Sequence, residues 1–166
     1  KTVESSEPRF QGARRVENIV PFSENMEATG WVEASASITS PTTVDLSGSS
    51  GSSVYIDCVV SGGSANKTMS ASVLLWVNSG TETIRLKNVH SSVLSYTSPD
   101  IEINTTPTRY NFTQIYGAGA GTGNASIGLQ NALAGGVKTI NASDWMFEDI
   151  TGQTNQNPSE YVSTGV

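Results

Sequence analysis

The sequence predicts an all-β protein, an antiparallel β-sandwich of two sheets of the jelly-roll kind. Three observations lead to this prediction. The chain holds 24 Ser, 18 Thr and 16 Gly, whereas charged residues, which usually cover the surfaces of helices, make up only 14%. Short stretches that alternate apolar and polar residues recur along the chain. A helical pattern is nowhere sustained over three turns.

Length and polarity divide the 166 residues into three parts. Residues 1–16 show no period of either kind and predict an extended arm. Residues 17–150 are long enough for one sandwich domain with a proper core. Residues 151–166 (TGQTNQNPSEYVSTGV) predict a polar connector, because they bury too little apolar surface to offset the entropy of ordering them alone. Since the chain begins at Lys1 rather than Met, we expect a segment of a larger or processed protein.

The first elements of the sandwich are expected to be short. Residues 17–26 (ENIVPFSENM) predict a strand that Pro21 interrupts, at an edge or a bulge. Residues 30–40 (GWVEASASITS) and 42–46 (TTVDL) predict further strands. The run SGSSGSS at 47–53 predicts a flexible loop.

The two clearest strands cover residues 53–60 and 67–80. One face of each carries alternating apolar side chains and is expected in the core: Val54, Ile56, Cys58 and Val60 in the first strand, and Met69, Ala71, Val73, Leu75 and Val77 in the second. Residues 78–80 (NSG) predict a turn, after which residues 82–89 return as a strand. Together they predict a β-hairpin.

The remaining strands complete the predicted sandwich. Residues 95–104 and 108–117 predict a second antiparallel pair. The glycine-rich residues 118–123 (AGAGTG) lack the Lys-Ser/Thr of a phosphate-binding loop and are interpreted as a plain connection. Residues 124–133 and 137–150 supply the last strands. Trp31 and Trp145 are expected to lie in the core.

Composition argues against several classes of function. The net charge is −6 and the nine basic residues are scattered, whereas nucleic-acid binding needs a concentrated cationic face. The longest bulky apolar run is VLLWV at 73–77, too short to span a membrane. The single Cys58 cannot form an internal disulfide and predicts a buried thiol. A single His90 excludes zinc sites built on several imidazoles.

Catalysis would have to come from carboxylates. A glycosidase needs two of them across a cleft, one with a raised pKa. The candidates are Asp57, Asp100, Glu102, Asp144, Glu148 and Asp149. Most of these lie at solvated, off-core strand positions, so we predict that the chain is not an enzyme. A glycan depolymerase is the least favoured interpretation.

No cofactor is predicted, but jelly-roll modules often join their first and last strands through a calcium ion held by oxygen ligands. Glu24, Glu27 and Asp149 are the weak candidates for such a structural calcium site. Solvated acids at strand ends are the alternative.

An outward surface is the more informative feature. Trp76 and Asn78 oppose the core face of their strand, Tyr55 and Asp57 oppose theirs, and Arg85 and Lys87 point outward from 82–89. An aromatic ring beside a carboxylate and two cations suits a sugar-binding surface, because the ring packs on a pyranose while polar groups take its hydroxyls. The predicted ligand-binding residues are Trp76, Tyr55, Asp57, Arg85, Lys87 and Asn78. The alternative, that a loop or a neighbouring subunit covers Trp76, is equally compatible with the pattern.

Three stretches resemble a module of bacteriophage tail-fibre and other virion proteins. They are EPRFQGARRVENIVPFSENMEATGW (7–31), SASVLLWVNSGTETIRL (70–86) and FEDITGQTNQNPSEYVSTGV (147–166). The resemblance implies a carbohydrate-binding-module-like jelly roll, non-catalytic, on the surface of a virion. It implies a host-surface glycan as ligand and other virion proteins as partners, with a homotrimer as the usual assembly. It identifies no sugar-binding residue. A structural decoration subunit without sugar binding is the alternative.

Overall fold

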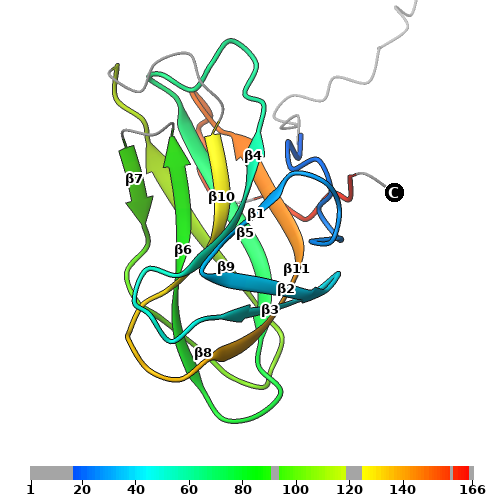
Figure 1. Ribbon diagram of the computed structural model, residues 1–166. Helices are drawn as coiled ribbons and strands as arrows, with labels where there is room; N and C mark the ends of the chain where they lie inside the picture. Colours follow the sequence, from blue (N-terminus) through cyan, green and yellow to red (C-terminus); the bar gives the residue numbers. More distant parts are fainter. Residues whose placement is uncertain (1–16, 91–93, 119–124, 158, 165–166) are drawn as a thin grey trace, which may run out of the picture.

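The computed structural model describes residues 17–90, 94–118, 125–157 and 159–164. These residues form eleven β-strands and no α-helix, arranged as two antiparallel sheets (Figure 1). The two-sheet β-sandwich predicted from the sequence is confirmed. The predicted arm at 1–16 and most of the 118–123 connection lie outside the described residues. Nowhere in the described part is there a helix with the length and apolarity needed to cross a bilayer.

The six-stranded sheet has the order β1 (Trp31–Ala34), β4 (Ser53–Cys58), β10 (Ala125–Asn131), β6 (Glu82–His90) and β7 (Leu94–Thr97), with β8 (Ile101–Ile103) also paired to β6. The five-stranded sheet has the order β2 (Ala36–Ser40), β3 (Thr43–Leu46), β11 (Lys138–Asp149), β5 (Thr68–Trp76) and β9 (Thr108–Ile115). All the pairings between these strands are antiparallel.

The core lies between the sheets and is filled by alternate side chains, as period-2 patterning requires. Every apolar residue predicted to face the core from 53–60 and 67–80 is buried. Trp145 is fully buried, and its ring centroid lies 5.1 Å from that of the partly buried Trp31. Burial, with a smaller contribution from the nearby Asp57, raises the pKa of the Cys58 thiol, so this group is an inert core residue.

Strand pairing differs from the prediction. The strands expected to form a hairpin lie in different sheets, because β5 pairs with β9 and β11, whereas β6 pairs with β7, β8 and β10. The second expected pair is also wrong, since β8 and β9 belong to different sheets. Residues 30–40 likewise divide into β1 and β2 at Ser35, whose φ is +54°. Alternation shows which side of a strand is buried, but either sheet can bury that side.

The predicted strand at 17–26 is wrong, although its expected edge position is right. Residues 21–24 form a turn that begins at Pro21. Around it, Ile19 N donates to Phe147 O and Trp145 N donates to Ser23 O, both at 2.9 Å. The side chain of Asn18 supplies two further bonds to β11, accepting from Phe147 N and donating to Trp145 O. Proline lacks an N–H and cannot continue a ladder, so the segment follows the edge of β11 without becoming a strand.

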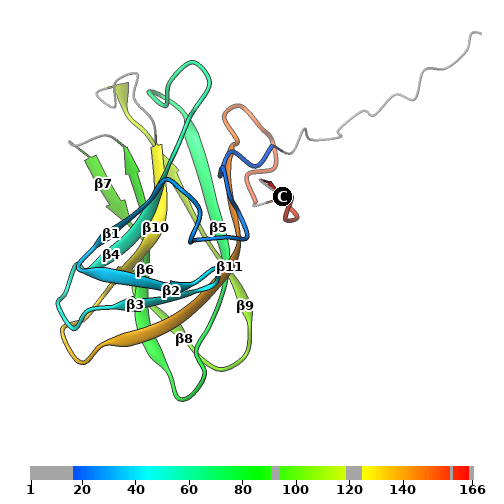
Figure 2. The same cartoon turned by 45° about the vertical axis from the view of Figure 1, so that its right-hand side comes forward.

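Residues 159–164, which we name the strap, lie beside this N-terminal segment (Figure 2). Asn18 Nδ2 donates to Val162 O at 2.7 Å, and Thr164 N donates to Ser23 Oγ at 2.9 Å. Thus part of the polar stretch assigned to the connector packs on the sandwich. It lies on the side of the five-stranded sheet.

Candidate functional site

The structure separates the six predicted ligand-binding residues into two groups. Tyr55 and Asp57 on β4 share the outer face of the six-stranded sheet with Arg85 and Lys87 on β6. Trp76 ends β5, and Asn78 follows it, on the five-stranded sheet. The expected single platform is therefore corrected to two faces on opposite sides of the sandwich. The cause is the crossing between sheets that takes the place of the predicted hairpin.

The first group forms what we name the Tyr55 face. Gly128 of β10 lies directly between Tyr55 and Lys87 in the strand register. A Cβ at Gly128 would lie 2.0 Å from Val54 O, so only glycine permits this close approach. Lys87 Nζ lies 4.9 Å from the centroid of the Tyr55 ring and donates to Ser53 Oγ. Burial lowers the pKa of Lys87.

The charged groups of the Tyr55 face are engaged by neighbouring side chains. Arg85 Nε and Asp100 Oδ1 form an ion pair at 2.6 Å. The Ser126 hydroxyl donates to the Asp57 carboxylate. Since Lys87 already lies over Tyr55, the aromatic and ionic groups predicted to contact sugar are engaged with protein atoms.

The second group belongs to what we name the Trp76 face, the part of the outer surface of the five-stranded sheet around Trp76. Trp76 is half-buried and Asn78 is exposed. Directly beside Trp76 in the register lies Asn141 of β11, which donates through Nδ2 to Asn78 Oδ1 at 3.0 Å. Thr43 Oγ1 donates to Asn141 Oδ1 at 3.2 Å, so uncharged polar groups are linked from β3 through β11 to Asn78, which follows β5.

Arg109 of β9 marks the border of the Trp76 face toward the strap. Its guanidinium donates to Ser72 Oγ at 2.9 Å and to Asp144 O at 3.1 Å. Asp144 has a φ of +54° and lies where the register of β11 shifts between Ser143 and Met146, so its conformation is strained for a non-glycine residue. Burial lowers the pKa of Arg109, and Asp144 and Tyr161 partly offset this effect.

Sequence reasoning did not single out Thr43, Asn141 or Arg109 as site residues. Alternation within 137–150 does place Asn141 opposite Ile140 and Ala142, so an outward amide could have been recognised there. Its position beside Trp76 could not, because β5 and β11 are more than sixty residues apart in the chain.

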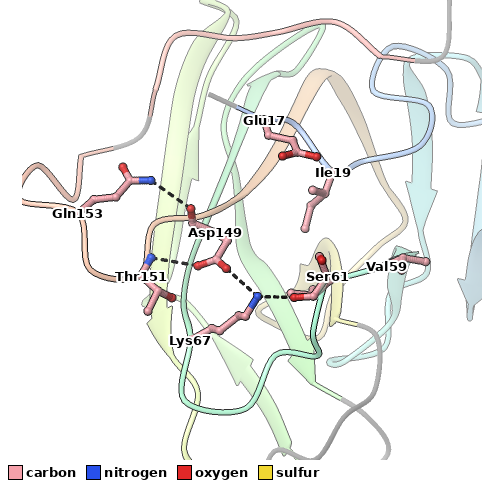
Figure 3. A pocket seen from close by; sticks show the side chains of 9 residues that line it. Glu17, Ile19, Val59, Ser61, Lys67, Asp149, Thr151 and Gln153 are labelled. Atoms are coloured by element: carbon pink, nitrogen blue, oxygen red, sulfur yellow. Dashed lines mark hydrogen bonds and ion pairs between the residues drawn. The ribbon is translucent and has the colours of Figure 1, made fainter. Parts of the chain in front are cut away.

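A hollow of about 320 Å³ lies at one end of the sandwich, next to the last residues of β11 (Figure 3). Inside it, Lys67 Nζ lies 2.8 Å from Asp149 Oδ2 and donates to Ser61 O at 2.6 Å. Burial alone would raise the pKa of Asp149, but hydrogen bonds from Lys67 and Thr151 outweigh burial and lower it. The Lys67 ammonium thus already neutralises this carboxylate.

The three candidate calcium ligands do not come together. Asp149 pairs with Lys67, while Glu24 accepts a hydrogen bond from the Tyr161 hydroxyl at 2.9 Å. Within the described ranges, no group of three or more Asp, Glu, His or Cys side chains is placed to hold a metal ion. The calcium site expected at Glu24, Glu27 and Asp149 therefore stays a prediction, and Asp149 and Glu24 are engaged with different protein partners.

A second hollow, open to solvent, lies beside Trp31 and is also lined by Met26, Glu27, Glu33 and Ile38. Its groups have structural roles. Trp31 packs against Trp145, and Glu33 Oε1 accepts the Ile38 amide at 2.6 Å. We therefore place the candidate site at the Trp76 face, where a half-buried indole and the exposed amide of Asn78 lie on the outer surface.

No protein-family model and no curated protein matches the chain. Solved structures do match. The CBM22-1 xylan-binding domain from Paenibacillus barcinonensis Xyn10C is 8% identical, with a TM-score of 0.58 over 84% of this chain and 99% of that one. TmCBM61 in complex with beta-1,4-galactotriose is 12% identical, with a TM-score of 0.50 over 80% and 99%.

An arabinose-bound MgGH51 α-L-arabinofuranosidase is 13% identical, with a TM-score of 0.60 over 87% of this chain but only 28% of that one. This likeness therefore concerns a minor part of the arabinofuranosidase. At such identities the similarity establishes the fold alone, and the bacteriophage origin implied by the sequence resemblance has no counterpart among these three structures. The chain has the jelly-roll fold found in carbohydrate-binding modules.

Proposed function

We propose that this domain is a non-catalytic carbohydrate-binding module that binds its glycan on the Trp76 face. The observation that carries the proposal is a half-buried indole on an outer sheet surface, beside the exposed amide of Asn78. The shared fold of modules described as xylan-binding or as bound to galactotriose supports it.

The chemistry of the Trp76 face suits a neutral sugar. An indole ring offers a flat apolar surface to the C–H face of a pyranose, with favourable contact area and little rotamer entropy to lose. The exposed Asn78 combines a carbonyl acceptor with an NH₂ donor, which matches the donor and acceptor character of sugar hydroxyls, and the buried Asn141 holds this amide in place through its Nδ2. Since these groups are uncharged, the cost of desolvating them on binding is smaller than for an ion.

The Tyr55 face is the weaker candidate because a cation already covers its aromatic ring. Lys87 lies over the Tyr55 ring, and Arg85 is paired with Asp100. A sugar that stacked on Tyr55 would first have to displace an ammonium. That displacement would cost the cation–π contact and the hydrogen bond to Ser53.

The biological setting remains a proposal that the sequence resemblance supports. We infer a virion surface, a host-surface glycan as ligand, other virion proteins as partners and a homotrimeric assembly. A shallow site of this kind would bind a single chain weakly. Repetition on a symmetric particle would raise the avidity by orders of magnitude without a new contact.

Titration of the domain with xylohexaose and beta-1,4-galactotriose, together with an array of bacterial surface polysaccharides, tests the proposal. We expect Trp76→Ala to weaken binding by about 2 kcal/mol, or roughly thirtyfold in Kd, as for a central aromatic anchor. Tyr55→Ala is the matched control on the opposite sheet and should leave the Kd unchanged. Binding that survives Trp76→Ala, or the absence of any bound glycan, would contradict the proposal.

A structural decoration subunit is the second candidate, favoured by the half-buried Leu74 close to Trp76 and by Ile115, which is 67% exposed on β9 of the same sheet. Sedimentation at increasing protein concentration separates the two functions. Self-association that Trp76→Ala abolishes would indicate a subunit interface. A depolymerase is disfavoured for Asp149, because hydrogen bonds from Lys67 and Thr151 lower the pKa of this carboxyl, whereas a catalytic acid needs a raised pKa. Release of reducing ends from a polysaccharide would reverse that conclusion.

A further inference from the structure

We propose that the strap is a displaceable cover that shortens the glycan-binding surface of the five-stranded sheet. This inference rests on the proposed function, because it assigns a role to the part of the same sheet that continues from the Trp76 face. The strap would restrict binding to short glycans or chain ends, and longer glycans would have to displace it.

The covered part lies in line with Trp76. Alternation along β5 places Ser70, Ser72, Leu74 and Trp76 on the outer surface. Leu74 and Trp76 are half-buried, whereas Ser70 and Ser72 are each only 1% exposed. Outward-facing serines in a sheet of one domain are normally solvated, so something within the chain covers this half of the surface.

Two side chains of β9 lie on these serines, and the strap lies on one of them. Thr113 Oγ1 donates to Ser70 Oγ at 3.3 Å, and Arg109, which is bound to Ser72, lies against the strap. Arg109 donates to Ser72 Oγ, and its guanidinium lies 5.3 Å from the centroid of the Tyr161 ring. Next to Ser70 in the register is Glu148 of β11, which is 3% exposed and lies beneath Ser159. The boundary between the open and the covered half therefore falls between Leu74 and Ser72, at Arg109.

Ser159 hydrogen-bonds to the Glu148 carboxylate in the way that a sugar could. Its backbone N–H donates to one carboxylate oxygen and its hydroxyl to the other, both at 2.9 Å. Two neighbouring donors on one carboxylate are also what vicinal sugar hydroxyls supply. A glycan that extends past Trp76 can therefore replace the strap without leaving Glu148 as a buried, unpaired charge.

The strap is held by contacts that can exchange with a ligand. The Tyr161 hydroxyl donates to Glu24 and lies 2.8 Å from Ser23 Oγ, and Val162 and Thr164 bond to Asn18 and Ser23. The Val162 side chain is 40% exposed. Each polar contact gives a small net gain, whereas ordering the strap costs backbone entropy at every residue. A ligand that displaces the strap would therefore exchange these hydrogen bonds for its own and release the backbone entropy that ordering the strap costs.

The test compares the full chain with its Tyr161→Ala variant, using xylohexaose and xylobiose as probes. Tyr161→Ala removes the ring under Arg109 and the bonds to Ser23 and Glu24. We expect xylohexaose to bind about tenfold more tightly, as follows when a cover closed about nine-tenths of the time is released. The affinity for xylobiose should not change. Val162→Ala is the matched control within the strap and should alter neither affinity.

A second measurement follows the strap directly. Addition of xylohexaose to the unmodified chain should speed hydrogen exchange at the amides of Ser159 and Thr164, but not at those of β5. If these two amides stay protected, or if both glycan lengths respond alike to Tyr161→Ala, the strap is a fixed part of the fold, while binding at Trp76 still stands. If neither the full chain nor Tyr161→Ala binds xylohexaose, xylobiose or any other glycan of the panel used for the proposed function, that function fails, and this inference fails with it.

Discussion

The outer faces of the two sheets carry polar residues at the same alternating positions, yet they use them differently. On the Tyr55 face, the charges of Arg85 and Asp100 neutralise each other, and Lys87 covers the aromatic ring. On the Trp76 face, the exposed amide of Asn78 lies near a half-buried indole, and Arg109 marks the border toward the strap. A ring covered by a neighbouring cation is therefore lost as a stacking surface, whereas a half-buried indole beside an exposed amide keeps one for a neutral ligand.

The largest effect tests the core that both faces share. Trp145→Ala removes a fully buried ring and should lower the free energy of unfolding by about 3–5 kcal/mol. Urea denaturation measures this loss. Val137→Ala, at a site that is 67% exposed, should stay within about 0.5 kcal/mol of the parent. Equal losses in the two variants would mean that Trp145 does not support the sandwich.

The next prediction concerns a substitution beneath the Tyr55 face alone. Gly128→Ala should destabilise the domain by about 1–3 kcal/mol, because the new methyl group would collide with Val54 O and the Tyr55 backbone. Thermal unfolding reports the effect. Gly117→Ala is the matched control, since a Cβ there meets no atom within 4 Å. A Gly128→Ala protein as stable as this control would show that β10 and β4 are farther apart than described.

A smaller effect is expected at the end of the five-stranded sheet, where the free energy of unfolding should depend on pH. Because the folded pKa of Asp149 is lowered, its ion pair with Lys67 stabilises the fold above the ordinary carboxyl pKa of about 4, and this stability is lost as pH falls through the folded value. Unfolding free energies between about pH 5 and pH 2 should therefore fall less steeply in Lys67→Met than in the parent. The difference should be below about 1 kcal/mol, since the pair is partly exposed. Parallel pH profiles would contradict the shift.

The smallest effect returns to the Tyr55 face. Asp100→Asn removes the ion pair with Arg85, whose side chains are 34% and 45% exposed, and should cost about 0.2–0.5 kcal/mol. Raising the salt concentration should reduce the difference from the parent in chemical denaturation. A loss of stability several times larger would mean that the ion pair between Arg85 and Asp100 contributes substantially to the stability of this face.

Several features of the fold were predictable because they depend on local pattern. The alternating apolar rows of 53–60 and 67–80 identified the buried sides of β4 and β5 residue by residue. Trp76 and Asn78 were recognised as outward for the same reason. Thr43 and Asn141 were missed because they lie near Trp76 only through the pairing of β11 with β5 on one side and with β3 on the other. No local pattern encodes which strands are neighbours.

By itself, the sequence determined the fold class, the buried side of the main strands and the inert character of Cys58. These properties follow from the two-residue period of a strand and from the need to bury apolar side chains. Only the tertiary structure decided which sheet each strand joins, and hence that Trp76 and Tyr55 lie on opposite faces and that the strap lies against Arg109 and Glu148. Both sheets present similar apolar inner faces, so the choice between them depends on contacts between residues far apart in the chain.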